Sequence, residues 1–95
     1  MNETNLLKII NIYGVIPQLK YFQSEVFELN EAVINNEWLK SERGTECINH
    51  IAEEIADVTV MLKQFQYYYG IENEMIKNIM DYKIKRQLER IKQND

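Results

Sequence analysis

The chain has 95 residues, 45% hydrophobic and 27% charged, with a formal net charge of −4 at pH 7. This length and composition indicate one small globular domain spanning residues 1–95. The acidic balance disfavours binding to nucleic acid through a basic face, and no apolar run is long enough to cross a membrane. We expect a cytoplasmic protein, since no secretory signal is apparent and the single cysteine, Cys47, has no internal disulfide partner. A lone cysteine also fits an unpaired extracellular thiol.

Apolar side chains recur at three- and four-residue steps, which predicts amphipathic helices. A short helix is expected over residues 6–13, followed by a break at Gly14 and Pro17, with Pro17 early in the next helix. That second helix should end near Asn35 and Asn36. Its apolar stripe consists of Leu19, Phe22, Val26, Leu29 and Val33.

A polar loop is predicted between Glu37 and Glu46 on the basis of Ser41, Arg43, Gly44 and Thr45. The third helix should stop at Gly70, which suits the left-handed residue after a helix end. Its stripe consists of Ile48, Ile51, Ile55, Val58, Leu62 and Phe65. A fourth helix is expected over residues 72–92, and its stripe consists of Ile76, Ile79, Met80, Ile84, Leu88 and Ile91. The predicted fold is all-α, a helical bundle of three long helices plus a short N-terminal helix, completed by a second subunit.

The two central helices carry matched pairs of acids. Glu25 and Glu28 are three residues apart, as are Glu54 and Asp57, so each pair projects from one side of its helix. Each pair has the same position relative to its apolar stripe. If the stripes pack antiparallel, the pairs meet at one edge of the interface. A single such pair is most often a solvated helix face, whereas for two pairs in the same register a solvated face and a site are even alternatives.

Four carboxylates in one place repel each other, and a hard dication relieves that repulsion. Mg²⁺ and Mn²⁺ prefer oxygen ligands, and Mg²⁺ commonly shares its coordination with substrate phosphates. Zinc is disfavoured because no cysteine or histidine completes the set. The pairs therefore predict a Mg²⁺ site, for which Mn²⁺ is a possible substitute.

The acid-bearing segments resemble a known family. Residues 14–31, GVIPQLKYFQSEVFELNE, and residues 50–58, HIAEEIADV, are similar to the MazG-like all-α nucleoside-triphosphate pyrophosphohydrolases. That family carries E-E-x-x-E on one helix and E-x-x-D on the next, followed by a helix with Lys and Arg. The resemblance covers roughly residues 14–92.

The resemblance implies Mg²⁺ ligation by Glu25, Glu28, Glu54 and Asp57. It implies phosphate contacts from the fourth helix, at Lys83, Gln87 and Arg90. The implied reaction hydrolyses an NTP or dNTP to the monophosphate and pyrophosphate, by water attack at the α-phosphorus, and clears unwanted nucleotides. Of the four acids, Glu28 or Glu54 is expected to be the catalytic base. The implied assembly is a homodimer or homotetramer.

Two positions depart from the family pattern. Ser24 stands where the first Glu of E-E-x-x-E would be, and Gln87 replaces an asparagine. Both put catalytic strength in question more than fold. A non-catalytic helical module that binds a nucleotide or a partner is therefore the alternative from another functional class. A phosphoribosyl-ATP pyrophosphohydrolase is a nearer alternative, although residues 48–62 resemble the MazG-like group better.

Residues outside the acid pairs have weaker functional interpretations. Cations at Lys83, Arg86 and Arg90 can reach phosphates, but the helix dipole also favours cations near a helix C-terminus. His50, one turn before Glu54, is more often a surface histidine than a partner of a ligand carboxylate.

The aromatic residues and the cysteine are also ambiguous. Trp38 is a weak candidate for stacking on a base, and packing is its more common role. The Tyr67–Tyr69 run is interpreted as core or subunit interface. Cys47 is interpreted as inert, because no histidine lies at a suggestive spacing.

Overall fold

The computed structural model describes residues 2–39 and 45–94. Its elements are α1 (Glu3–Tyr13), α2 (Val15–Ile34), the π-helical segment η1 (Asn35–Leu39), α3 (Thr45–Tyr68) and α4 (Asn73–Asn94). The described residues form no strand, which confirms the all-α prediction of a short N-terminal helix and three longer ones. No helix among these residues is long and apolar enough to span a membrane.

The turn between α1 and α2 depends on Gly14. Asn2 begins α1 by accepting a hydrogen bond from the Asn5 amide, at 3.3 Å. Gly14 ends α1 at φ +92°, ψ 152°, a conformation that is essentially restricted to glycine. Its amide donates to the Ile10 carbonyl, and Pro17 follows in the first turn of α2, where its missing N–H costs no hydrogen bond. The chain therefore changes direction between α1 and α2 without a loop, at the predicted break.

The segment after α2 is longer than expected. Helical structure continues through η1 to Leu39, so the predicted loop does not begin at Glu37. Cys47 at the start of α3 ties this end down, because its Sγ lies 3.0 Å from Asn36 Oδ1. Thr45 already belongs to α3. The loop prediction for residues 40–44 falls outside the described residues.

The elbow between α3 and α4 is built on Gly70 and Asn73. Gly70 has φ +68°, its amide donates to the Tyr67 carbonyl, and the Ile71 amide donates to the Gln66 carbonyl. These two bonds form the Schellman motif that commonly ends a helix. Asn73 Oδ1 then accepts hydrogen bonds from three α3 side chains: Lys63 Nζ at 2.8 Å, Gln66 Nε2 at 2.8 Å and Tyr67 Oη at 3.3 Å.

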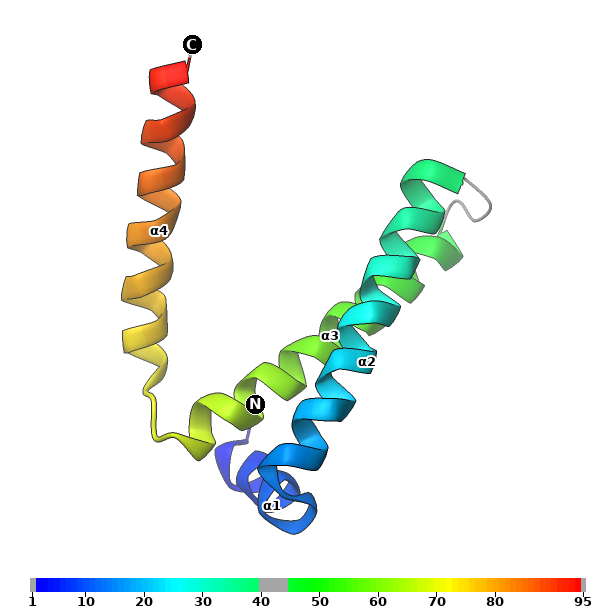
Figure 1. Ribbon diagram of the computed structural model, residues 1–95, viewed down its shortest axis with the longest axis vertical. Helices are drawn as coiled ribbons and strands as arrows, with labels where there is room; N and C mark the ends of the chain where they lie inside the picture. Colours follow the sequence, from blue (N-terminus) through cyan, green and yellow to red (C-terminus); the bar gives the residue numbers. More distant parts are fainter. Residues whose placement is uncertain (1, 40–44, 95) are drawn as a thin grey trace.

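The packing is confined to the first three helices. Helices α2 and α3 run antiparallel side by side, and α1 packs across their lower end (Figure 1). Helix α4 leaves the elbow and stands apart from α2 and α3 along most of its length (Figure 1). None of its side chains is buried.

The contact between α2 and α3 is a narrow and largely polar seam. From α2 it buries Gln18, Glu25 and Ala32, which are seven residues apart and so lie on one side of the helix. From α3 it buries Cys47, Met61 and Gln64. Elsewhere among the described residues, the buried apolar side chains are Leu6 and Ile10 of α1.

The predicted apolar stripes take part in this contact only along one edge, where Phe22 of α2 meets Phe65 of α3 edge to face, with ring centroids 5.7 Å apart. On α3, Ile48, Ile55 and Leu62 are 60%, 51% and 52% exposed. The stripe of α4 is exposed as well. The condition that the stripes pack against each other is met only in part, because the α3 seam lies roughly a quarter turn around the helix from its stripe. Glu25 and Glu54 consequently lie inside the helix contact, whereas Glu28 and Asp57 are exposed at its border.

Candidate metal centre

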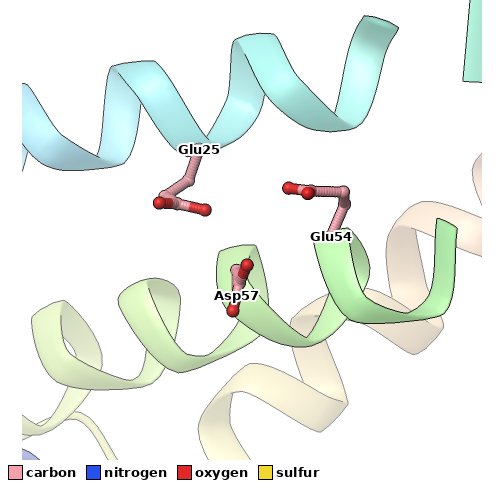
Figure 2. A group of neighbouring side chains, drawn as sticks. All are labelled: Glu25, Glu54 and Asp57. Atoms are coloured by element: carbon pink, nitrogen blue, oxygen red, sulfur yellow. The ribbon is translucent and has the colours of Figure 1, made fainter. Parts of the chain in front are cut away.

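Three of the predicted ligands converge in the seam. Glu25 of α2 points toward Glu54 and Asp57 of α3 (Figure 2). One carboxylate oxygen from each residue lies within 4.8 Å of one from each of the others. Because Glu54 and Asp57 are three residues apart on α3, both face the single carboxylate of Glu25. We refer to Glu25, Glu54 and Asp57 as the carboxylate triad.

Two carboxylates of the triad are shielded from solvent. The Glu25 residue is only 5% exposed, and the Glu54 side chain is 13% exposed. Glu25 Oε2 and Glu54 Oε2 are both buried without a hydrogen-bond partner. Burying a carboxylate oxygen without a hydrogen-bond partner costs free energy. These two oxygens lack the positive charge or hydrogen-bond donor that would offset this cost.

Electrostatics around Glu54 reflect this crowding. Burial raises the pKa of the Glu54 carboxyl from 4.5, and the negative charges of Glu28, Asp57 and Glu25 raise it further. His50 opposes this shift, since its Nε2 lies 3.6 Å from Glu54 Oε1 and a protonated imidazole would lower the pKa. His50 is exposed, as expected of a surface histidine, and its contact with Glu54 is longer than a hydrogen bond.

Glu28, the fourth predicted ligand, lies at the rim. It is exposed on α2 and is not among the three residues whose oxygens converge. Its negative charge nevertheless raises the pKa of both Glu54 and Tyr21, which places Glu28 close to the triad. Ser24, one residue before Glu25, is also exposed and lies beside Glu28 in a shallow surface depression.

The residues of the triad fit a hard dication. They offer only carboxylate oxygens, two of which are buried and unpartnered, and this donor set suits Mg²⁺ or Mn²⁺. No described cysteine or histidine belongs to the group.

A cavity of about 600 Å³ opens beside the triad, between α1, α2 and α3. Glu25 and Asp57 are among the residues that line it. Its other lining residues are mostly apolar or aromatic: Ile9, Tyr13, Pro17, Gln18, Tyr21, Val60, Met61 and Gln64. Apolar walls with a few polar groups are typical of small-molecule sites.

Two polar features of this cavity were missed in the sequence. Gln18 Nε2 donates to Gln64 Oε1 at 2.8 Å across the seam. A hydrogen bond to Glu25, and the charge of that carboxylate, raise the pKa of the Tyr21 hydroxyl, with smaller contributions from burial, Asp57 and Glu28. The available signal was the seven-residue spacing, since Gln18 precedes Glu25 by seven and Gln64 follows Asp57 by seven.

The predicted phosphate contacts are not brought to the triad by their own chain. Lys83, Gln87 and Arg90 are exposed on α4, which is directed away from the α2–α3 seam (Figure 1). Arg86 lies over the ring of Tyr82 instead, 5.8 Å from its centroid.

The remaining candidates lie away from the site. Trp38 is 81% exposed on η1, and the helical rise from Glu25 puts it about 20 Å along the axis. The Cys47 thiol is buried and forms a hydrogen bond to the Asn36 side chain. The tyrosine run contributes to the elbow through Tyr67, and Tyr68 and Tyr69 contact each other edge to face.

Comparisons of the chain with profiles of known protein families, with curated proteins and with solved structures return no match. The resemblance to the MazG-like group therefore rests on the two acid-bearing segments and stays a prediction.

Proposed function

We propose that the protein is a Mg²⁺-dependent nucleoside-triphosphate pyrophosphohydrolase that converts an NTP or dNTP to the monophosphate and pyrophosphate. The observation that carries the proposal is the carboxylate triad, which has two buried and unpartnered oxygens and contributes Glu25 and Asp57 to the wall of a cavity. Acids placed in this way are costly unless they bind a cation, and a triphosphate needs one to approach them.

Glu25, Glu54 and Asp57 would hold Mg²⁺. When bound, the ion neutralises the carboxylates and the phosphates and polarises the phosphoryl group toward attack. Glu25 supplies a fixed ligand from α2, because the surrounding seam leaves its side chain little room. The base that takes the proton of the attacking water is Glu28 at the rim or Glu54, whose raised pKa brings it closer to neutrality.

The cavity supports a nucleotide substrate. Its apolar walls with Tyr13 and Tyr21 accommodate a base, while the carboxamides of Gln18 and Gln64 offer polar groups to the base edge. The part of the cavity next to Glu25 would then receive the phosphates. A base bound there replaces the weaker candidate Trp38. Cleavage of unwanted nucleotides in the cytoplasm, by a homo-oligomer, is the role that follows from this proposal.

A second candidate is a non-catalytic helical module that binds a nucleotide or a partner. Two observations favour it: the cations of α4 lie away from the triad of the same chain, and Ser24 provides no carboxylate beside Glu25. A nucleotide binder of this kind would keep the cavity and lack turnover.

The test is pyrophosphate release from a panel of NTPs and dNTPs, with and without Mg²⁺. We expect Mg²⁺-dependent turnover that falls at least about 100-fold in Glu54→Gln and in Asp57→Asn, because each removes a ligand. Glu53→Gln is the matched control, since Glu53 is exposed and lies outside the triad. Absence of release from folded protein that binds Mg²⁺ would refute the hydrolase and leave the binding module.

A further inference from the structure

One side of the molecule is apolar and largely exposed to solvent, although Phe65 at its edge contacts Phe22 of α2. On α3 it consists of Ile48, Ile51, Ile55, Val58, Leu62, Phe65 and Tyr69, which recur at alternating steps of three and four residues. On α4 it consists of Ile76, Met80, Ile84, Leu88 and Ile91. We call these two stripes together the outer face. Between them, in the elbow, lies an apolar hollow of about 530 Å³ with Leu62, Phe65, Ile76 and Met80 in its lining.

We propose that the outer face is the docking surface for a second copy of this chain, and that α4 of each copy packs against α3 of the other. The α3 stripe follows the 3.5-residue repeat of helices that pack along their length against a neighbour. Within one chain this stripe is mostly left open: Phe22 of α2 contacts Phe65 at one edge, whereas Ile48, Ile55 and Leu62 stay more than half exposed.

The exposed area matches the requirement of a dimer. The chain exposes 7626 Å², whereas a compact monomer of this size exposes about 5,800 Å². The excess of about 1,900 Å² per copy exceeds the roughly 800 Å² that each partner buries in a standard interface. Its radius of gyration, 16.5 Å, likewise exceeds the about 12 Å expected of a compact domain.

The elbow holds α4 in a position that presents this surface. Asn73 Oδ1 accepts hydrogen bonds from Lys63, Gln66 and Tyr67, and Gln66 Nε2 also donates to the Ile71 carbonyl at 2.9 Å. These contacts fix the first turn of α4 to the end of α3. The rest of α4 then projects away from its own chain (Figure 1).

Charge complementarity favours a second copy over an unrelated apolar partner. Lysine and arginine outnumber acids in α4, whereas acids outnumber them in α2 and in α3. A basic α4 laid on the acidic body of another copy therefore gains from long-range attraction, while two copies of α4 or two bodies would repel. This charge pattern therefore favours a dimer in which α4 of each copy packs against the body of the other copy, which is an exchange of α4 between copies.

The exchange would also complete the candidate metal centre, a step that rests on the proposed function. On a helical wheel, Lys83, Gln87 and Arg90 form a ridge beside the apolar ridge of Ile84, Leu88 and Ile91. When the apolar ridge packs on α3 of the partner, the cation ridge runs along the border of the interface. On α3 that border is next to Glu54, so the cations of one copy approach the triad of the other.

The first test is sedimentation equilibrium of the full chain over a range of concentrations. We expect a dimer, and we expect Leu62→Glu on α3 and Leu88→Glu on α4 each to weaken it at least 100-fold. Ala56→Glu and Asn78→Glu add the same charge at exposed positions on the opposite sides of these helices and should leave the dimer intact. Circular dichroism on each variant reports whether its helices remain folded.

A wild-type chain that sediments as a monomer would overturn the proposal. If its radius of gyration fell well below 16.5 Å, α4 would be folded back on its own α3. If that radius persisted, the outer face would belong to a different protein. Dimers of Leu62→Glu and Leu88→Glu as tight as those of the two controls would overturn it as well.

The exchange of cations has its own test. We expect Glu54→Gln and the double variant Lys83→Ala, Arg90→Ala each to be inactive. Mixed in equal amounts, they should recover about a quarter of wild-type turnover, because half of the dimers are mixed and each mixed dimer has one complete site. Without recovery, the cations do not act in the partner's site. An inactive wild-type chain that still dimerises would refute the hydrolase and the catalytic role of the cations, and would leave the dimer standing.

Discussion

At the scale of residues, the main feature is that carboxylates occupy positions that helix packing normally gives to apolar side chains. Glu25 and Glu54 each hold a buried oxygen without a partner, and Asp57 adds a third charge within 4.8 Å. Without a cation, this arrangement opposes folding whenever the acids are ionised. The raised pKa of Glu54 expresses the same penalty.

Glu54→Gln should therefore stabilise the metal-free protein near neutral pH. Since the pKa of Glu54 in the folded state lies above 4.5, the protonated acid is favoured by folding, and its contribution to stability is lost as the pH rises through the raised pKa. The variant, which stays neutral, avoids that loss. Urea unfolding in the presence of EDTA should show the variant more stable than wild type at pH 7 and the two converging below about pH 4.

The control for this comparison is Glu53→Gln, which should change the free energy of unfolding by less than about 0.5 kcal/mol at either pH. Added Mg²⁺ should stabilise the wild type more than Glu54→Gln, because only the wild type retains all three carboxylates. A variant less stable than wild type in EDTA at pH 7 would show that Glu54 has a stabilising contact and contradict this account.

At the scale of elements, the α3–α4 elbow decides the direction of the last helix. Gly70 adopts the left-handed conformation that closes the Schellman motif, and no atom lies within 4 Å of the position of an added Cβ. The effect of a substitution there is therefore conformational and not steric. Asn73 then joins the first turn of α4 to α3 through its hydrogen bonds.

Gly70→Ala should reduce the free energy of unfolding by about 1 kcal/mol, because an L-residue pays to enter the left-handed region. Gly70→Asn should cost less, since asparagine tolerates that conformation better. Thermal or urea unfolding of the two variants measures the difference. Equal losses for Ala and Asn would indicate that the backbone conformation at residue 70 is not what ends α3.

At the scale of the whole molecule, the described chain is an open arrangement with extents of 43 × 36 × 22 Å, in which three helices pack and one projects. Its buried apolar side chains are few, and its longest apolar stripes face solvent. A domain of this length has a small hydrophobic core. Most of its stability should therefore come from burying the outer face in an oligomer.

Stability should consequently depend on protein concentration. If unfolding also separates two copies, each tenfold rise in concentration adds about 1.4 kcal/mol to the apparent free energy of unfolding per mole of dimer. Urea or thermal unfolding of the wild type at three concentrations measures this shift. Leu88→Glu should abolish the dependence and Asn78→Glu should keep it, whereas a midpoint independent of concentration in the wild type would contradict a folded dimer.

The local structure of this protein could be predicted from its residues in order. Periodicity located the four helices, and the turns at Gly14 and Gly70 followed from glycine's access to positive φ. The spacing of the acids predicted two pairs on neighbouring helices, Glu25 with Glu28 and Glu54 with Asp57; the structure brings Glu25, Glu54 and Asp57 together and leaves Glu28 at the rim.

Only the tertiary structure decided which helix faces meet. The apolar stripe is the strongest periodic signal, yet the α2–α3 contact uses the polar seam that includes Gln18, Glu25 and Gln64. Local periodicity defines the faces of one helix but not their partners, because partner choice depends on chain reversal at a distant turn and on surfaces that other helices leave uncovered. For this reason the cavity between α1, α2 and α3, the place of Glu28 at the rim and the outward course of α4 appear only when the helices are placed in space.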